Sequence, residues 1–352
     1  MNNQFLETVE RLENGKKLSL QEFDILVRNR NSETFTFLRE KAEALRRLYY
    51  GKTVYLRGLI EISNICSCDC YYCGIRASNK NADRYRLLPE QIYACCEQGH
   101  AAGYRTFVLQ GGEDPWFTDE CLEEILKHIK EKYPDCAVTL SVGERSRESY
   151  QRLFDAGADR YLLRFETANP EHYNQLHPAN TTLENRLRCL KDLKEIGYAV
   201  GTGFLVGAPY EKEEYLAHNL FLLQQIEPHM VGIGPFLPQR DTPFRNEAAG
   251  DFDKTLYLLA IIRVMLPNVL LPATTAINTL RKNGRGEAIK TGANVIMPNL
   301  SPPDMRAKYA LYDGKVSTGS ESAEGWRETE EEMKKIEYCV VSARGDRAEK
   351  KL

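Results

Sequence analysis

The stretch Ile65-Cys66-Ser67-Cys68-Asp69-Cys70-Tyr71-Tyr72-Cys73-Gly74 carries the most specific chemistry in this sequence. It holds four of the ten cysteines in the 352-residue chain, and three of them, Cys66, Cys70 and Cys73, have the spacing C-x3-C-x2-C. Protein iron–sulfur clusters are usually held by four thiolates. Three thiolates on a cubane cluster leave one iron without a protein ligand, so that a small molecule can chelate it. The spacing therefore predicts a 4Fe–4S cluster held by these three cysteines.

The same cysteines are also compatible with two different arrangements. Cys68 could join the other three in a structural zinc site with four thiolates. Zinc ligands usually come as one pair with a second pair well downstream, and no second pair follows here. The four residues could also be buried free thiols, although their density and the flanking Ser67 and Asp69 make poor core material. We favour the three-cysteine cluster.

Nothing in the composition indicates a nucleic-acid or membrane partner. The 47 basic and 50 acidic residues are interspersed along the sequence and give a formal net charge of −3. The sequence shows no apolar N-terminal segment of the signal-peptide type and no apolar run long enough to span a bilayer. We therefore expect a cytoplasmic protein whose remaining cysteines are core thiols rather than disulfides.

Apolar periodicity divides the chain into three parts. Residues 1–50 form a helical segment, residues 51–325 alternate strands and helices, and residues 326–352 contain a helix near Thr329–Cys339 and a charged, frayed terminus. Strand-like runs that alternate with helical ones indicate a parallel α/β fold. Eight such units predict a (β/α)8 TIM-type barrel with an N-terminal helical cap and a short C-terminal extension. The predicted strands are Val54–Ile62, Thr106–Gln110, Cys136–Val142, Arg160–Phe165, Tyr198–Val206, Met230–Phe236, Val269–Ala273 and Ala293–Met297.

Functional side chains of such a barrel lie at the C-terminal ends of its strands. There the sequence places Gln110-Gly111-Gly112-Glu113, then Ser141, then Arg164-Phe165-Glu166. Together with the cysteine motif, these phrases resemble the radical S-adenosylmethionine (SAM) superfamily. The resemblance implies that the open iron binds SAM and that one electron from the cluster cleaves SAM to a 5′-deoxyadenosyl radical. By position it implies cluster or SAM contacts for Tyr72, Gly111, Gly112, Glu113, Ser141, Arg164, Glu166 and Arg186.

Longer phrases narrow this resemblance to the HydE family of FeFe-hydrogenase maturases. That family resemblance implies a role in assembling the di-iron subcluster of the hydrogenase, with sister maturases and an electron donor such as ferredoxin or flavodoxin. The implied substrate is a small organometallic iron–cysteine–carbonyl–cyanide complex in a closed cavity. The cavity residues implied by position are Arg57, Gln110, Thr274, Thr275, Met297, Tyr309 and Tyr312. The phrases are Glu61–Cys66, Leu109–Pro115, Asp159–Arg164 with Glu166–Pro170, Met230–Phe236, Pro272–Ala276 and Ala293–Asn299.

The sequence leaves two other functions open. The chain could be a paralogue that acts on an amino-acid-type substrate, as methylornithine synthase does, or an iron–sulfur scaffold without radical chemistry. Phe165 stands where some HydE proteins have histidine, which is compatible with a different substrate.

Two further expectations concern individual side chains. A buried arginine needs an anionic or strongly accepting partner. None is evident among the strand neighbours of Arg57, so we expect the substrate to be its partner. The six histidines show no ligand spacing, and we expect His172 and His177 to lie on the surface of a helix.

Overall fold

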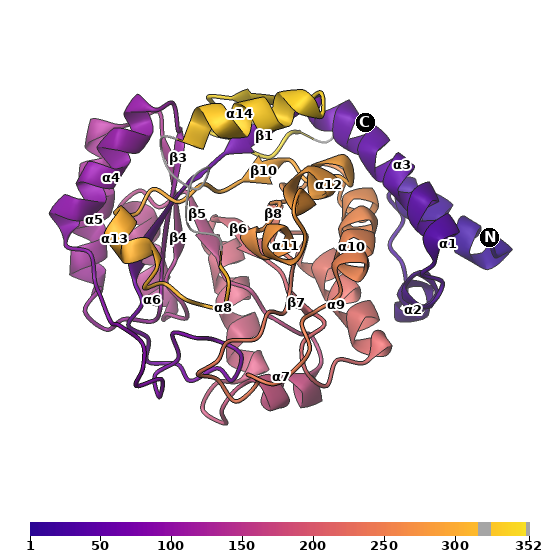
Figure 1. Ribbon diagram of the computed structural model, residues 1–352, viewed down its shortest axis with the longest axis horizontal. Helices are drawn as coiled ribbons and strands as arrows, with labels where there is room; N and C mark the ends of the chain where they lie inside the picture. The colour runs from indigo at the N-terminus through magenta and orange to yellow at the C-terminus, as the bar shows by residue number, and fades with distance from the viewer. Residues whose placement is uncertain (316–324, 350–352) are drawn as a thin grey trace.

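Parallel strands form a closed barrel in the computed structural model, which describes residues 1–315 and 325–349 (Figure 1). Six strands form one sheet in the order β2-β3-β4-β5-β6-β8. After β8 the ring continues through residues 270–272, which are joined by the single bridges Met230↔Leu270 and Pro272↔Val295. The second of these bridges leads to β10, and β10 pairs with β1. The bridge Leu59↔Asn299 then closes the ring onto β2. The eight-position barrel predicted from the sequence is confirmed. The strand bounds are β1 Thr53–Leu56, β2 Gly58–Ser63, β3 Thr106–Gly111, β4 Ala137–Ser141, β5 Arg160–Leu162, β6 Ala199–Thr202, β8 Met230–Val231 and β10 Val295–Ile296.

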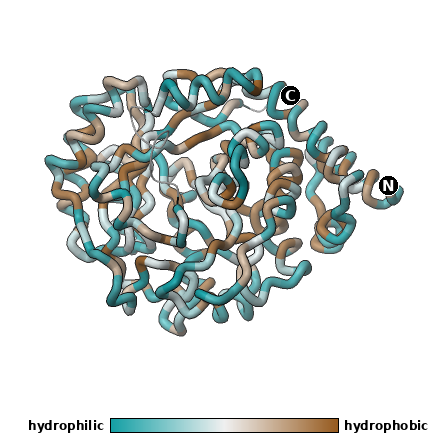
Figure 2. Tube along the Cα trace, in the orientation of Figure 1, coloured by the Kyte–Doolittle hydropathy of each residue, from teal (hydrophilic) through white to brown (hydrophobic). Residues whose placement is uncertain are grey.

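Helices surround the barrel because each turns an apolar face toward the strands. Side chains of Thr118, Ser146, Thr182 and Asp251 cap four of these helices at their N-termini. The helix α10 is buried over nearly its whole length and is largely hydrophobic in Figure 2. The bounds are α4 Pro89–Ala101, α5 Asp119–Lys132, α6 Arg147–Asp155, α8 Leu183–Ile196, α9 Glu213–Ile226, α10 Phe252–Met265 and α12 Gly284–Lys290.

Several predicted strands are shorter or interrupted. The predicted run 54–62 is divided at Arg57, and 198–206 and 230–236 are divided into β6 and β7 (Leu205–Val206) and into β8 and β9 (Gly234–Pro235). The break after β6 brings two backbones together, because a Cβ atom on Gly203 would lie 2.0 Å from the carbonyl oxygen of Gly232. A helix around His172 was predicted and is α7 (Pro170–Leu176), although not as a buried one, whereas the sequence did not predict two other short helices, α11 Thr275–Leu280 and α13 Pro303–Arg306.

The N-terminal helices α1 (Asn3–Glu13), α2 (Leu20–Arg28) and α3 (Ser32–Tyr50) lie outside the barrel helices, at the right in Figure 1. The helix α2 packs against α9, and α3 packs against α10. Near the end of α3, buried Arg46 donates to the carbonyl oxygens of Gly51, Thr53 and Ala293. These helices share one hydrophobic core with the barrel, so a domain border at residues 50 and 51 stays a prediction.

The C-terminal part corrects two expectations. The predicted helix near Thr329–Cys339 spans Trp326–Lys335 instead (α14), and the terminus predicted to be frayed contains a strand, β11 (Cys339–Val341). The strand β11 pairs in parallel with the free edge of β1, Thr53 lying opposite Cys339. Residues 342–349, which we call the C-terminal tail, then reach the N-terminal ends of the barrel strands. The paired residues are far apart in the sequence and form only three pairs, so no local pattern predicts this pairing.

The described part of the chain contains no helix that is both long and apolar enough to cross a membrane.

Candidate cluster and cofactor site

The cysteine loop follows β2 at the C-terminal end of the barrel. Cys66, Cys70 and Cys73 are half-buried in the folded chain. Cys66 lies close enough to Cys70 to raise its pKa, and both lie close enough to Cys73 to raise its pKa. The amide of Cys73 donates to the carbonyl of Cys70 at 3.3 Å, and the amide of Ser67 donates to the carbonyl of Glu113 at 3.0 Å. The fold therefore gathers the three predicted ligands on one turn of chain beside the end of β3.

The thiols of this loop have perturbed acidities. Burial raises the pKa of Cys70 to about 12 and also raises that of Cys73. The adjacent Cys68 thiol lowers the pKa of Cys66 to about 7. Thiols that burial keeps protonated lose their protons when a cation binds, because a metal-bound thiol is deprotonated outright.

At the end of β3, Gly112 lets the cysteine loop approach closely, and the amide of Glu113 contacts a cysteine sulfur. A Cβ atom on Gly112 would lie 2.3 Å from the carbonyl oxygen of Ile65 and 2.7 Å from the Cβ of Cys66. The amide of Glu113 donates to the sulfur of Cys66 at 3.3 Å, a contact that favours a thiolate. The residues present therefore fit a cluster held by three cysteines.

Two side chains outside the predicted site fix the loop. Asp69 accepts from Arg76 at 2.5 and 2.8 Å and from the amide of Ser78 at 3.0 Å. The guanidinium of Arg84 donates to four backbone carbonyls between 2.5 and 3.0 Å, those of Asn64, Ile75, Arg76 and Asn79. A planar cation with five donors can hold such a set of carbonyls in one place. No local sequence signal indicates this role, because the four acceptors come together only in the folded loop.

Charged groups from the segments after β4 and β5, and from α8, lie beside the cysteines. The side chain of Arg164 donates to Glu166 at 2.8 Å, and Arg186 donates to the carbonyl of Arg164 at 2.7 Å. Arg186 also donates to Glu144 at 2.5 Å, and Glu144 accepts from Asn185. Burial alone would lower the pKa of Arg186, but Tyr173 and Glu144 raise it, so the guanidinium stays charged. Both Glu166 and Arg186 lie near enough to Cys70 to influence its pKa.

Glu166 has an unusual backbone conformation. Its φ is 64°, in the left-handed region that costs a side-chain-bearing residue on the order of 1–3 kcal/mol. The amide of Leu205 donates to the Glu166 carbonyl at 3.0 Å, which holds this conformation. The result is that the carboxylate lies against Arg164 and near the cysteine loop.

Tyr72 is held by a histidine that the sequence predicted to lie on the surface. Both His172 and His177 are buried, 2% and 1% exposed. His172 lies against Pro209 and Tyr215, and His177, directly after α7, lies against Tyr72 of the cysteine loop. Burial lowers the pKa of His177 to about 3, so its ring is neutral. Its Nδ1 lies 2.9 Å from the carbonyl of Tyr173, so Nε2 is the nitrogen that accepts from the Tyr72 hydroxyl at 3.2 Å. The aromatic ring beside Cys73 is thereby fixed in orientation.

Polar groups from the barrel interior meet near the cysteines. Gln110 donates to the hydroxyl of Tyr309 at 3.3 Å, and both Cys73 and Glu61 lie near enough to Tyr309 to affect its pKa. Buried Glu61 pairs with Lys315 and accepts from Asn299 at 2.8 Å. Thr274 Oγ1 is buried and has no hydrogen-bond partner in the described part of the chain. Thr275 begins α11, and Tyr312 follows Leu311, whose carbonyl accepts from the amide of Gly74.

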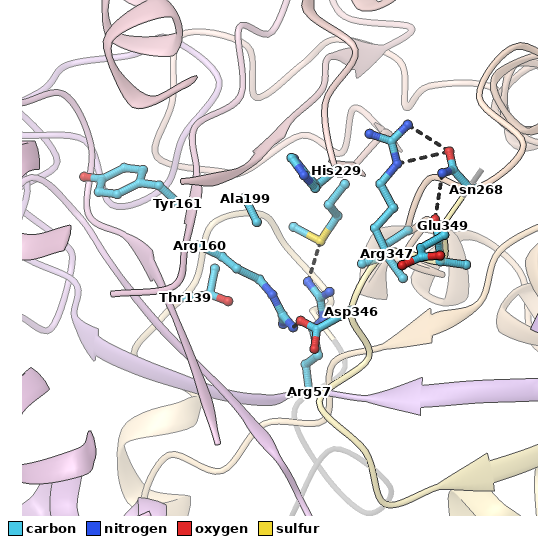
Figure 3. Close-up of a pocket in the computed structure, with 13 residues that line it drawn as sticks. Arg57, Thr139, Arg160, Tyr161, Ala199, His229, Asn268, Asp346, Arg347 and Glu349 are labelled. Atoms are coloured by element: carbon cyan, nitrogen blue, oxygen red, sulfur yellow. Dashed lines mark hydrogen bonds and ion pairs between the residues drawn. The ribbon is translucent and has the colours of Figure 1, made fainter. Parts of the chain in front are cut away.

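Two predicted cavity residues lie at the other end of the strands. Met297 packs with Met230, Leu270 and Val295, and Arg57 precedes β2. Arg57 donates to the sulfur of Met230 at 2.9 Å and to the carbonyl of Gly345 at 3.2 Å, beside a cavity of about 340 Å³ (Figure 3). Burial and nearby Arg160 lower the pKa of Arg57, which Asp346 partly opposes. The acceptor that Arg57 contacts comes from the C-terminal tail and not from a neighbouring strand, so a substrate partner for Arg57 stays a prediction.

The comparisons with known proteins point in one direction. The family model described as "Radical SAM superfamily" matches residues 60–223. The chain is 44% identical to the [FeFe] hydrogenase maturase subunit HydE of Thermotoga maritima, over 89% of this chain and 88% of that protein. The chain belongs to the HydE family. It is a radical SAM enzyme, and its cofactors are a 4Fe–4S cluster and SAM.

Solved structures show that the HydE-family fold is shared more widely. Methylornithine synthase has a TM-score of 0.83 at 24% identity, over 95% of this chain and 97% of that one. The FeFe-hydrogenase maturase HydG of Carboxydothermus hydrogenoformans has a TM-score of 0.71 at 27% identity, over 84% of this chain and 70% of that one. At 24% identity, the similarity to methylornithine synthase shows a shared fold and nothing about function.

In this HydE-family protein the structure brings most predicted site residues to one mouth of the barrel. The cysteines, Tyr72, the glycine segment, Glu166 and Arg186 lie together there, and Ser141 ends β4 opposite Gln110. Sequence reasoning missed the groups that fix these side chains, namely Arg84, Glu144, His177 and the Glu61–Lys315 pair. Glu144 lies close after the end of β4, and that position in the sequence indicates a site residue. The other contacts depend on residues far apart in the sequence, which no local pattern indicates.

Proposed function

We propose that this HydE-family protein cleaves SAM reductively and acts in assembly of the di-iron subcluster of FeFe-hydrogenase. The observation that carries the proposal is the 44% identity to a HydE maturase along almost the full length of both chains. The proposed partners are the sister maturases, a small organometallic substrate and an electron donor of the ferredoxin or flavodoxin kind.

The proposed cluster ligands are Cys66, Cys70 and Cys73. When bound, the cluster and SAM together supply a 5′-deoxyadenosyl radical. The chain's own part is to orient SAM, with Gly111, Gly112 and Glu113 at the end of β3 and Ser141 at the end of β4. Glu166 and Arg186 offer one acceptor and one donor that are charged, and such hydrogen bonds are roughly twice as strong as neutral ones. Arg164 holds Glu166 at 2.8 Å, which supports the same role.

The proposed substrate residues fall in two groups. Gln110, Thr274, Thr275, Tyr309 and Tyr312 are the group nearer the cluster. Thr274 Oγ1 supports this proposal because a buried hydroxyl without a partner is available to a ligand. Arg57 and Met297 are the distant group, at the N-terminal end of β2. We expect Arg57 to act through its charge on an anionic ligand such as iron-bound cyanide, in addition to its contact with the tail.

The test is a reconstituted maturation assay with the sister maturases, an unmatured hydrogenase, SAM and a reductant. We expect hydrogen evolution to depend on this protein and to be lost in Cys70→Ser, which also loses SAM cleavage. SAM cleavage without any hydrogenase activation would contradict the maturase role while leaving radical chemistry intact. Absence of SAM cleavage by iron-loaded protein would support a scaffold instead.

A second candidate is an amino-acid-type substrate. The observation that favours it is the buried Glu61–Lys315 pair, since an amino acid needs an acceptor for its ammonium and a donor for its carboxylate. The measurement is SAM cleavage in the presence of the common amino acids, followed by mass spectrometry for a rearranged product. A product formed without the sister maturases would favour this candidate.

A further inference from the structure

A shallow groove lies on the outer surface of the cysteine loop. One wall is formed by residues that follow the last cysteine and the other by the segment after β9. It encloses about 500 Å³ and is separate from the cavity at the tail. The lining residues are Arg76, Ser78, Asn79, Lys80, Asn81, Arg240, Asp241, Thr242, Pro243 and Arg245.

The groove is basic, although the chain as a whole has a net charge of −3. Four cations line it against one carboxylate, Asp241, which accepts from Asn81 at 2.7 Å. Arg76 pairs with Asp69, and Arg240 pairs with Asp313 at 3.5 Å. Lys80 and Arg245 are exposed and have no ion-pair partner within residues 1–315 and 325–349. Two positive charges are therefore left for a partner.

Both walls connect directly to the chain around Cys73. The amide of Arg76 donates to the carbonyl of Cys73 at 3.2 Å. Asn79 donates to the carbonyl of Gly74 at 2.7 Å, and a Cβ atom on Gly74 would lie 2.9 Å from the side chain of Gln239, next to Arg240. Only the backbone of a few residues separates the groove from a proposed cluster ligand.

Aromatic side chains continue this surface on one side. The ring of Tyr71, in the cysteine loop, packs 6.3 Å from Phe244, which packs 6.1 Å from Tyr210. Tyr210 is 58% exposed. An exposed aromatic beside charged groups is typical of protein interfaces, where aromatics and arginine are enriched.

We infer that this groove is the docking surface for a small acidic electron-transfer protein. The inference rests on the proposed function, because cleavage of SAM requires one electron from outside the chain. In the docked complex the reduced carrier gives one electron to the oxidised cluster and is itself oxidised by one electron. Complementary charge speeds such encounters by roughly 10- to 1,000-fold and makes them sensitive to salt.

The test measures binding separately from catalysis. Reduced flavodoxin serves as the acidic probe, and surface plasmon resonance measures its affinity for the cluster-loaded protein at low and high salt. The variant is the double reversal Lys80→Glu/Arg245→Glu. The matched control is Lys16→Glu/Lys17→Glu, which reverses two exposed lysines in the loop after α1. We expect the groove variant to bind flavodoxin at least about tenfold more weakly at low salt and the control to bind normally.

A second readout uses cluster-loaded protein. Flavodoxin-driven SAM cleavage should slow in the groove variant, whereas cleavage driven by saturating dithionite should match wild type. Equal affinity of the groove variant and the control for flavodoxin would overturn the docking surface, whatever the catalytic result. Failure of wild type to cleave SAM with dithionite would instead contradict the proposed function, and the binding experiment would still decide the groove.

Discussion

At the scale of single residues, Cys68 distinguishes a three-thiolate cluster from a four-thiolate metal site in the cysteine loop. Its thiol lies beside Cys66. Its backbone carbonyl accepts from the amide of Ala77 at 2.8 Å, a contact that helps to hold the loop and does not need the thiol. We predict that Cys68→Ser keeps the iron content and SAM cleavage, since the other three cysteines supply every ligand. Cys66→Ser, Cys70→Ser and Cys73→Ser should each lose both. Loss of iron in Cys68→Ser, measured by the iron-to-protein ratio after reconstitution, would favour a four-thiolate site.

Gly112 allows a second residue-scale prediction, based on space alone. Gly112→Ala would place a methyl group 2.3 Å from a backbone oxygen of the cysteine loop, and backbone cannot yield as a side-chain tip can. We expect the loop to shift and the reconstituted iron content to fall several-fold. Gly286→Ala is the control, because its Cβ would meet only Ile336 at 3.8 Å. Normal iron content in Gly112→Ala would show that the loop tolerates displacement.

The third residue-scale prediction concerns Glu166 and Arg186. Glu166→Gln keeps the shape and removes the charge, whereas Glu166→Ala also removes the acceptor. We predict that Glu166→Ala and Arg186→Ala weaken SAM binding at least tenfold, which corresponds to about 1.4 kcal/mol. Isothermal titration of cluster-loaded protein checks this, and iron content should be unchanged in both. Wild-type affinity in both variants would remove these residues from the SAM site.

At the scale of elements, the C-terminal tail is held to the barrel by charge. Arg160 of β5 is nearly buried and pairs with Asp346 at 2.5 Å, and Arg160 also donates to the carbonyl of Arg344 at 2.9 Å. Gly345 between them has φ of 60°, and a Cβ atom there would lie 2.8 Å from the ring of Tyr55. The tail therefore fits one conformation against β1 and β5.

Asp346→Ala tests this attachment. A hydrogen bond to a charged group contributes about 1.5–3 kcal/mol, and we expect the lower end because Asp346 is largely exposed. Urea denaturation should show a lower midpoint with an unchanged slope. Glu349→Ala removes the same charge from a side chain that makes no hydrogen bond or ion pair within the described residues, so its midpoint should not move. Equal midpoints for the two variants would mean that the ion pair does not hold the tail.

At the scale of the whole molecule, the sequence predicted what is local and periodic. The alternation of strands and helices indicated the barrel, and the cysteine spacing placed the cluster loop at its C-terminal end. Contacts between distant segments could not be predicted in this way. Buried His177 is an example, because its neutral ring follows only from the loop that covers it, and Arg57 is another, because its acceptor comes from residue 345. Both contacts depend on how distant segments pack together, and the sequence of either segment alone does not indicate that packing.

The pairing of β11 with β1 has a consequence for how the protein is made. Cys339 bonds to Lys52, 287 residues earlier in the chain. At roughly 5–20 residues per second, a ribosome needs roughly 15–60 seconds to make that interval. Throughout that time the outer edge of β1 carries unpaired backbone groups, the arrangement by which nascent chains associate with one another. Chaperones that bind early segments during translation would therefore protect this edge until the last strand arrives.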